Sequence, residues 1–348
     1  MGLVLGIETS CDETSAAVVG EDGRVRSNVV SSQMRAHARY GGVVPEVAAR
    51  AHLENLPAVV EEALERAGVG LDDIGMLAAT AGPGLIGALL VGLSAAKAIA
   101  FARDLPLVGV NHLEGHLFSA FLRPGGEAPL PTTYPFHGLV VSGGHAELVR
   151  VEKKRIVALA RTRDDAPGEA FDKIARRAGL GYPGGPVIDR VAAKGRGDRF
   201  PFAIGRAGDG SRDFSFSGLK TAMLRELEKR GVDGSPLDPD ALDPELVDLL
   251  ASFQRAIVAA LMDRVEAVHA EEGIRALALS GGVAANSELR ATLAQWGQES
   301  GVPVFLPDRS FTTDNAAMIA WAGVLGARRG APMDPTAAAA RSRWPLGA

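Results

Sequence analysis

The sequence has a single cysteine, Cys11, among its 348 residues. One thiol cannot form an internal disulfide framework, so this count fits a reducing compartment. The N-terminus also lacks the basic segment and long apolar run of a signal peptide, because Glu8, Asp12 and Glu13 follow closely. We therefore expect a cytoplasmic protein.

One long apolar stretch, from Gly84 to Ala102, could be mistaken for a membrane span. It contains Lys97, and a charged side chain is costly inside lipid. Its many small residues instead suit a helix packed tightly against a sheet. We predict a buried helix here and no membrane partner.

The chain also lacks an overall positive charge, since its net charge is −5, which argues against a nucleic-acid partner. The distribution of charge points the other way. Residues 150–230 hold 19 lysines and arginines against 11 acidic residues. This asymmetry indicates either a basic face built by one half of the molecule or an ordinary solvated surface.

The length of the chain suits two domains. A break rich in proline and glycine at residues 123–136 predicts a boundary between domains at 1–122 and 137–306. We also expect a helix over 313–330 that returns to the first domain and a surface tail at 331–348. Both domains open with strand, polar turn, strand and strand, which suggests a duplicated unit. A helix predicted over residues 45–67 contains Pro57, which should break or kink it.

The most informative stretch is Asn111-His112-Leu113-Glu114-Gly115-His116. Two histidines four positions apart lie on one side of a helix and can point imidazole nitrogens at one cation. In zinc-protease motifs the glutamate adjoins one of the histidines, whereas Glu114 is two residues from each and faces away. The pair predicts a metal site and disfavours a metalloprotease. Helix-surface histidines without a metal are the alternative.

Asp314 is the best candidate for a third ligand, because it precedes an apolar helical run that begins at Ala316. Aspartate in this position is also a common helix N-cap, and spacing alone favours the cap. Both roles are compatible if Thr312 or Thr313 caps the helix and Asp314 points across to the histidines.

Three turns could bind a ligand. The turn over residues 9–15 carries hydroxyls and carboxylates that can contact phosphate or lie near a cation, although most such turns are plain polar turns. The turn over residues 142–145 and the one over 280–286 each contain Gly-Gly, which lets backbone N–H groups approach a phosphate or a nucleoside. A tight structural turn is the alternative in both cases. His145 is either a substrate contact or an ordinary loop histidine.

These motifs together resemble those of the TsaD family, the tRNA N6-adenosine threonylcarbamoyltransferases. The resemblance covers the whole chain and rests on Gly6–Thr14, Tyr40–Glu46, Thr80–Leu85, Asn111–His116, Val141–His145, Gly168–Lys173, Tyr182–Pro186, Asp213–Thr221, Ser280–Asn286 and Asp314–Met318. The histidine pair followed far downstream by Asp-Asn-Ala-Ala-Met is the most specific feature. Pro167 replaces an expected alanine at a first helical turn, where proline is tolerated.

The resemblance implies an actin/sugar-kinase/Hsp70-like (ASKHA) fold: two duplicated α/β domains with a nucleotide cleft between them. It also implies that His112, His116 and Asp314 hold one divalent metal, with Fe2+ favoured and Zn2+ the other choice. The residues that would contact ATP or threonylcarbamoyl-AMP are Val140, Val141, Ser142, Gly143, Gly144, Asp172, Gly185, Asp189 and Asn286.

The resemblance implies that the threonylcarbamoyl group passes from its adenylate to N6 of adenosine 37 in tRNAs reading ANN codons. We suggest Asp12 or Glu13 as the acid or base. Family members of bacterial type act with a small paralogue (TsaB) and an ATPase (TsaE). The helix over residues 45–67 is a candidate docking face, and a plain core helix is the default interpretation. An ATP-binding kinase-like enzyme or ATPase of the same fold is the alternative.

Overall fold

The computed structural model describes residues 2–38, 40, 42–205 and 210–347, which form two compact units. The first unit comprises Met1–Thr133, Lys153–Arg155 and Pro307–Ala348, and the second comprises Tyr134–Glu152 and Ile156–Leu306. The C-terminal helix thus belongs to the same unit as the N-terminal strands. Gly41, in the middle of one motif, lies outside the described residues.

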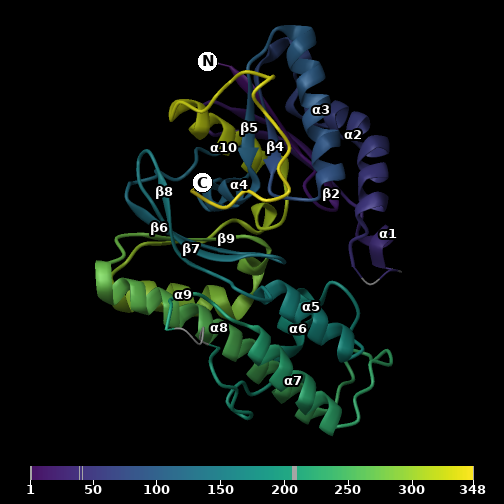
Figure 1. The fold of residues 1–348 in the computed structure, drawn as a ribbon, viewed down its shortest axis with the longest axis vertical. Helices are drawn as coiled ribbons and strands as arrows, with labels where there is room; N and C mark the ends of the chain where they lie inside the picture. The colour runs from purple at the N-terminus through teal and green to yellow at the C-terminus, as the bar shows by residue number, and fades with distance from the viewer. Residues whose placement is uncertain (1, 39, 41, 206–209, 348) are drawn as a thin grey trace. The chain divides into compact units, whose positions relative to one another are not determined.

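The first unit is built on a five-stranded sheet in the order β3-β2-β1-β4-β5 (Figure 1). Its strands are β1 Leu3–Glu8, β2 Glu13–Gly20, β3 Val25–Ser32, β4 Ile74–Gly82 and β5 Leu107–Asn111. The first three pair antiparallel, whereas β4 lies parallel to β1 and β5 parallel to β4. The carboxyl ends of β1, β4 and β5 therefore lie at one edge of the sheet, where open α/β sheets place their ligands.

The helices of this unit cover both faces of its sheet. They are α1 Met34–Ala38, α2 Pro45–Ala67, α3 Ile86–Arg103, α4 His112–Ser119 and α10 Ala316–Arg328, with short 3-10 turns at Leu71–Asp73 and Arg309–Phe311. Leu5 and Ile7 of β1 pack with apolar residues of α2 and α3. Gly6 faces α10 instead, because side chains alternate along a strand. Glu8, two residues further, lies on this same α10 side.

Helix α2 runs unbroken through Pro57, so the predicted break is wrong. Proline removes the hydrogen bond to the carbonyl four residues earlier, which belongs to Leu53. Both Pro57 and Leu53 are exposed, and water can bind the freed carbonyl. A proline on the solvent side of a helix is tolerated for this reason.

Helix α3 is not the fully buried helix that its composition predicted. One side, including Leu89 and Leu93, packs on the sheet, while Leu90 is 50% exposed and Phe101 88% exposed. Among the described residues, α3 is the one helix that is long and apolar enough to cross a membrane. A third of its residues are buried inside the protein.

The second unit repeats the topology of the first with strands in the order β10-β9-β6-β7-β8. Its strands are β6 Phe136–Val141, β7 Ala146–Val151, β8 Ile156–Arg161, β9 Leu277–Ser280 and β10 Val304–Phe305, and its helices are α5 Pro167–Arg177, α6 Gly184–Ala192, α7 Ser217–Lys229, α8 Pro244–Glu272 and α9 Ser287–Ser300. An antiparallel meander followed by two parallel strands occurs in both units. The predicted duplication is confirmed.

The C-terminal tail lies along the β4 and β5 end of the first sheet. The backbone N–H of Leu107 donates to the Met333 carbonyl at 3.1 Å, and the N–H of Arg341 donates to the Ala81 carbonyl at 2.7 Å. Ala338 and Leu346 are buried within this unit. The tail thus covers an edge that would otherwise leave strand groups unpaired.

Candidate metal centre

Helix α4 begins directly at the end of β5, and its first turn carries His112. Asn111 caps this helix, because its Oδ1 accepts hydrogen bonds from the N–H groups of Leu113 at 2.9 Å and Glu114 at 3.4 Å. The Asn111 amide also donates to the Trp344 carbonyl of the tail at 3.0 Å. The start of α4, which carries the histidine pair, is thus held by the end of β5, by the Asn111 cap and by the C-terminal tail.

Asp314 stands just before α10, and Asn315 is the N-cap of that helix. The Asn315 Oδ1 accepts from the Met318 N–H at 3.0 Å. The next free N–H of the helix, that of Ala316, donates to the Ser15 hydroxyl at 2.9 Å. The Asp314 cap that spacing alone favours is therefore wrong, and neither Thr312 nor Thr313 caps the helix, since Asn315 and the Ser15 hydroxyl satisfy its start. The Asp314 carboxylate is left to point toward α4.

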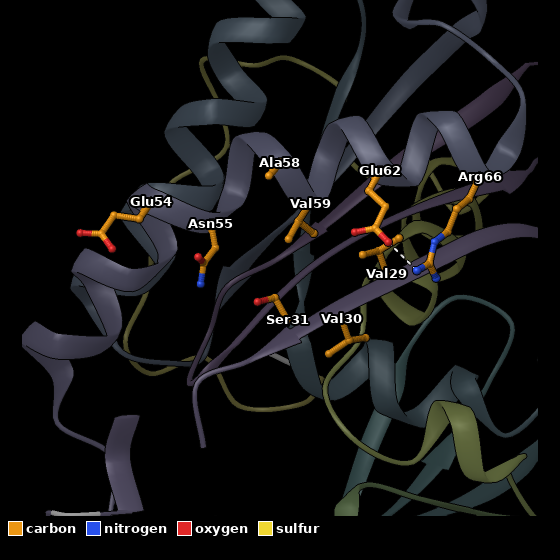
Figure 2. A pocket seen from close by; sticks show the side chains of 9 residues that line it. All are labelled: Val29, Val30, Ser31, Glu54, Asn55, Ala58, Val59, Glu62 and Arg66. Carbon is orange, nitrogen blue, oxygen red and sulfur yellow. Dashed lines mark hydrogen bonds and ion pairs between the residues drawn. The ribbon is translucent and has the colours of Figure 1, made fainter. Parts of the chain in front are cut away.

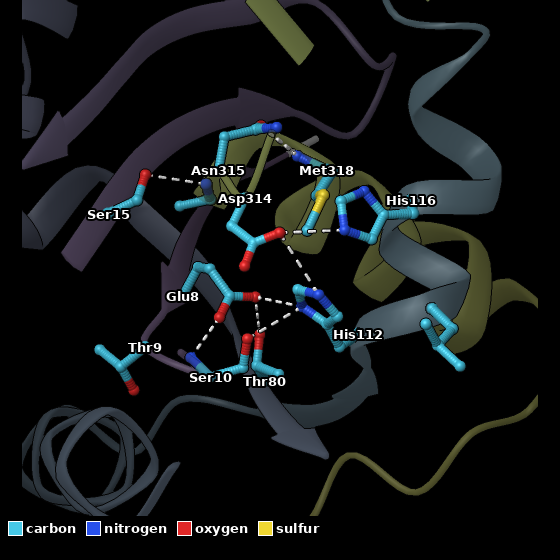
Figure 3. Close-up of polar contacts among 12 residues, drawn as sticks. Glu8, Thr9, Ser10, Ser15, Thr80, His112, His116, Asp314, Asn315 and Met318 are labelled. Atoms are coloured by element: carbon cyan, nitrogen blue, oxygen red, sulfur yellow. Dashed lines mark hydrogen bonds and ion pairs between the residues drawn. The ribbon is translucent and has the colours of Figure 1, made fainter. Parts of the chain in front are cut away.

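His112, His116 and Asp314 converge (Figure 3). The Asp314 Oδ1 lies 3.0 Å from His116 Nε2 and 3.4 Å from His112 Nε2. The two imidazole rings stand nearly perpendicular, with centroids 4.6 Å apart. One possible ligand atom from each residue falls within 4.8 Å of the others. The three residues predicted as ligands thus form one cluster within the first unit.

Glu8 orients His112 from behind. Its Oε2 lies 2.9 Å from His112 Nδ1 and also accepts from the Thr80 hydroxyl at 2.6 Å. The Ser10 hydroxyl lies 3.2 Å from the same ring nitrogen. A carboxylate acceptor places the proton on Nδ1, which leaves the lone pair of Nε2 directed at the cluster.

The cluster requires a positive charge. Burial opposes it, but the Asp314 and Glu8 carboxylates raise the pKa of His112 well above its ordinary value of 6.5. Burial likewise opposes ionisation of Asp314, yet His112 and His116 hold the pKa of this carboxyl below its usual range. A fully buried Glu8 carboxylate and a partly buried Asp314 carboxylate beside one imidazole favour a cation at this place, either a proton or a metal ion.

The donor set fits a transition-metal ion. Two imidazole nitrogens and one carboxylate oxygen form the facial arrangement known from non-haem iron and from zinc sites with open positions. The Glu8–His112 hydrogen bond is the supporting contact that such ligands usually make. His116 Nδ1, by contrast, is buried with no hydrogen-bond partner among the described residues.

Glu114 does not face this cluster. Its Oε2 forms an ion pair of 2.6 Å with Arg329 at the end of α10. The pair ties α4 to α10 on the side away from the histidines. A glutamate held in this way cannot serve as the base of a metalloprotease, which agrees with the prediction from its spacing.

Asp12, one of the two predicted acid or base residues, lies on the turn that follows β1, and Glu13, the other, is the first residue of β2. Burial, with the nearby charges of Asp314 and Asp12, raises the pKa of Glu13 to about 9. Glu13 would then carry a proton at neutral pH. Burial and the same acidic neighbours also raise the pKa of the Cys11 thiol. The charge of Asp314 therefore contributes to the raised pKa of both Cys11 and Glu13.

The predicted nucleotide contacts all lie in the second unit. Val140 and Val141 end β6, and the Ser142 N–H donates to the His145 carbonyl at 2.8 Å to close the turn. No described atom beyond the chain neighbours lies within 4 Å of a side chain built on Gly143 or Gly144. The Gly-Gly turn therefore leaves room for a ligand against its backbone.

The other predicted contacts are linked by hydrogen bonds. Asp172 of α5 accepts from the Gly184 N–H at 2.7 Å, next to Gly185 at the start of α6. Asp189 of α6 accepts from the N–H of Ser287 at 3.1 Å and from its hydroxyl at 2.8 Å. Asn286, beside Ser287, caps α9 and donates to Gln254 of α8 at 2.8 Å. The structure thus connects residues that are up to 98 positions apart in the sequence.

Two hollows flank the edge strand β3. One, of about 400 Å³, lies between β3 and α2 beside the ion pair of Glu62 and Arg66 (Figure 2). Another, of about 500 Å³, is lined by Val25–Asn28 together with Gly125 and Gly126. None of the predicted site residues lines either hollow. The metal cluster is therefore a compact buried site rather than part of these hollows.

Comparison with known proteins identifies the relatives of the chain. A family model described as TsaD, tRNA N6-adenosine threonylcarbamoyltransferase, matches residues 24–321. A relative of this description from Geobacter sp. (strain M21) is 49% identical over 349 residues, covering 99% of this chain and 96% of the relative. Another from Rhizobium meliloti (strain 1021) is 50% identical over 357 residues, covering 99% and 95%.

Solved structures share the fold at low sequence identity. HypF from T. kodakarensis has a TM-score of 0.59 at 17% identity, over 94% of this chain and 48% of HypF. An activator of 2-hydroxyisocaproyl-CoA dehydratase from Clostridium difficile has a TM-score of 0.51 at 12% identity, over 94% and 96%. With its two repeated α/β units, the chain is a protein of the actin-like ATPase fold. It belongs to the TsaD family of tRNA N6-adenosine threonylcarbamoyltransferases and is a transferase.

Proposed function

We propose that this protein transfers the threonylcarbamoyl group from threonylcarbamoyl-AMP to N6 of adenosine 37 in tRNAs that read ANN codons. The products are N6-threonylcarbamoyladenosine (t6A) and AMP. Membership of the family supports a tRNA-modifying transferase. The observation that carries the proposal is the convergence of His112, His116 and Asp314, although His116 and Asp314 are 198 positions apart in the sequence.

The transfer is an acyl substitution. The adenine N6 attacks the carbamoyl carbonyl carbon and forms the new C–N bond, the bond from this carbon to the AMP phosphate oxygen breaks, and N6 loses one proton. Asp12 would accept this proton at its carboxylate. The protonated carboxyl of Glu13, with its pKa raised to about 9 by burial and by neighbouring acids, would donate one to the departing phosphate.

His112, His116 and Asp314 would hold one divalent ion, iron or zinc, through Nε2, Nε2 and a carboxylate oxygen. Such an ion supplies Lewis acidity and orients a carbonyl or phosphate oxygen when bound. Glu8 would keep His112 in the tautomer whose Nε2 is free, and the N-caps Asn111 and Asn315 would fix the two helix starts.

Residues of the second unit would hold the adenylate or ATP. Ser142, Gly143, Gly144 and His145 offer an open turn with exposed backbone groups for phosphate. Asp172, Gly185, Asp189 and Asn286 would contact the nucleoside. Two hydrogen bonds support this assignment. Asp172 of α5 is bonded to the first residue of α6, and Asp189 of α6 is bonded to the first residue of α9.

The partners follow from the same family. We propose tRNA as substrate, and a TsaB-like paralogue and a TsaE-like ATPase as accessory proteins. Exposed apolar side chains on α2 and α3, among them Leu53, Leu90 and Phe101, support these two helices as the docking face for the paralogue. A tRNA substrate and a single cysteine support a cytoplasmic location.

A direct assay tests the proposal. The purified chain is mixed with threonylcarbamoyl-AMP and an unmodified tRNA transcript, with and without a TsaB-like paralogue, and nucleosides are measured by mass spectrometry. We expect t6A in the wild type, none in His112→Ala, and none in a transcript with guanosine at position 37. Absence of t6A from the wild type in both arms, or steady ATP hydrolysis without tRNA, would reject the proposal and favour the kinase-like alternative.

A further inference from the structure

A chain of buried polar side chains lies behind the turn that carries Asp12 and Glu13. Thr14, His37 and His52 are fully buried, and Gln33 is 4% exposed. They come from β2, α1, α2 and the end of β3. Buried polar groups are costly unless they are hydrogen-bonded, so their arrangement is specific rather than incidental.

Two backbone groups fix the direction of every hydrogen bond in this chain. At one end the Val44 N–H can only donate, so His37 Nδ1 accepts at 3.3 Å and the ring carries its proton on Nε2. His37 Nε2 therefore donates to Gln33 Oε1 at 3.2 Å. The Gln33 amide nitrogen then faces His52 Nδ1 at 3.2 Å, and the Thr14 hydroxyl lies 2.8 Å from the same nitrogen.

The other end of the chain is a carbonyl. With Nδ1 accepting, His52 carries its proton on Nε2 and donates it to the Cys11 carbonyl at 3.0 Å. A carbonyl can only accept, so both ends agree on one direction and both imidazoles are neutral. Burial also lowers the pKa of His52, which favours the neutral ring.

The anchored turn leads directly to the metal cluster. The backbone N–H of Gln33 donates to the Asp12 carbonyl at 2.9 Å. The carbonyls of Cys11 and Asp12 are therefore both hydrogen-bonded, the first to His52 and the second to Gln33. One residue before Cys11, the Ser10 hydroxyl lies 3.2 Å from His112 Nδ1. The turn is therefore fixed at the cluster by Ser10 and at the far side by His52 and Gln33.

We propose that His52, oriented by Gln33 and His37, is a positioning residue that fixes the Cys11–Glu13 turn beside the metal cluster through its hydrogen bond to the Cys11 carbonyl. Its effect on turnover rests on the proposed function, because it acts through Asp12 and Glu13. Its effect on the position of the turn does not depend on that function.

A matched pair of variants isolates the hydrogen bond to Cys11. In His52→Gln the amide nitrogen reaches about as far as imidazole Nε2, whereas in His52→Asn it reaches only about as far as Nδ1. Both side chains are uncharged amides and can meet Gln33 and Thr14. Only the glutamine can also donate to the Cys11 carbonyl.

The sole cysteine reports on the turn without any reaction taking place. Cys11 is half-buried, and its thiol can be modified with a small aromatic disulfide under native conditions. We expect His52→Asn to react about tenfold faster than the wild type, the effect of losing one net hydrogen bond on local opening. We expect His52→Gln to react within about threefold of the wild type.

Steady-state kinetics supply the second measurement. His52→Asn should lower kcat for t6A formation about 10- to 100-fold, the cost of misplacing catalytic groups, and leave KM for tRNA unchanged. His52→Gln should restore most of kcat. His137→Asn, at a buried histidine of the second unit that contacts Glu272, controls for general destabilisation and should change neither quantity.

The outcomes separate the two proposals. Equal thiol reactivity in His52→Asn and the wild type overturns the positioning role, and so does a His52→Gln variant that behaves like His52→Asn. If the wild type makes no t6A, the proposed function fails, while the thiol measurement still decides whether His52 fixes the turn.

Discussion

Glu8 is fully buried, and its charge is matched by its neighbours rather than by water. Its two oxygens accept from the Thr80 hydroxyl, the Ser10 N–H and the His112 ring. Burial would raise the pKa of Glu8, but the charge and hydrogen bond of His112 hold it below its ordinary value. A buried carboxylate with this set of partners acts as the support of a ligand rather than as a ligand of its own.

Replacing Glu8 by glutamine tests this supporting role. Glu8→Gln keeps the shape of the side chain but removes its negative charge and replaces one of its two accepting oxygens by an amide donor, which weakens the control of the His112 tautomer. We expect metal affinity, measured by competition with a chromogenic chelator, to fall by about 10- to 100-fold. Glu114→Gln, on the same helix but paired with Arg329, is the matched control and should bind metal as the wild type does. Equal affinities in the two variants would contradict the role of Glu8.

Glu147 of β7 makes a second prediction, about pH. Burial, opposed only in part by Arg161, raises the pKa of Glu147 above 4.5. The folded state therefore binds this proton more tightly than the unfolded state, and the stability gained below the ordinary pKa is lost as the pH rises through the folded pKa. Glu147→Gln should melt at a higher temperature than the wild type near pH 8.

This difference should shrink toward zero as the pH falls well below the ordinary value of 4.5, where Glu147 is protonated in both states. Thermal melting at several pH values measures it. Exposed Glu127→Gln is the control and should show no such trend. A melting difference for Glu147→Gln that does not depend on pH would refute the prediction.

At the scale of elements, the site depends on how closely α10 approaches β1. A side-chain carbon built on Gly6 would lie 2.4 Å from the Ala316 carbonyl oxygen and 2.9 Å from the Ala320 side chain. Only glycine leaves room for the helix start that carries Asp314. The strand and the helix are more than 300 residues apart in the sequence, yet they determine one ligand position.

Gly6→Ala should therefore push the start of α10 away from β1. We expect a loss of about 1–3 kcal/mol in the free energy of unfolding, from urea titration, together with weaker metal binding. Gly75→Ala, at an exposed position of β4 where the added carbon finds its nearest neighbour at 3.4 Å, should change neither. Unchanged stability and affinity in Gly6→Ala would mean that α10 does not need this close contact.

The sequence predicts site residues that lie close together on one helix, but it does not predict those brought together from different strands of the sheet. The spacing of His112 and His116 is enough to predict a ligand pair, because the helical repeat alone places them together. Glu8, Ser10 and Thr80 were not predicted as site residues, because the contacts of Glu8 and Ser10 with His112, and of Thr80 with Glu8, arise only when β1, β4 and β5 are ordered side by side. A glutamate at the end of a buried apolar strand was the available signal.

Other differences between the sequence predictions and the structure also arise from tertiary contacts. Composition predicted a buried α3, but one side of it is exposed, since composition does not show which side meets the sheet. Spacing alone favoured Asp314 as the cap of α10, but Asn315 caps this helix and its tertiary neighbour Ser15 supplies part of the capping. The buried chain from His37 to Cys11 has no sequence signal either, as its members come from four separate elements.

At the scale of the whole molecule, one topology occurs twice with different contents. Both units have the same strand order, but the first carries the metal cluster and the acidic turn, while the second carries the open Gly-Gly turn and its linked helices. The family and the fold expected from the motifs are both confirmed by the comparisons. One repeated scaffold thus presents different side chains at corresponding places in its two units.

The central claim is that three side chains hold one ion, and metal analysis of protein purified without chelator tests it most directly. We expect inductively coupled plasma mass spectrometry to find about one iron or zinc per wild-type chain, less than about a tenth of that in His116→Ala and in Asp314→Ala, and the wild-type amount in the control His269→Ala. A wild type without bound metal, or a full complement in either ligand variant, would contradict the account.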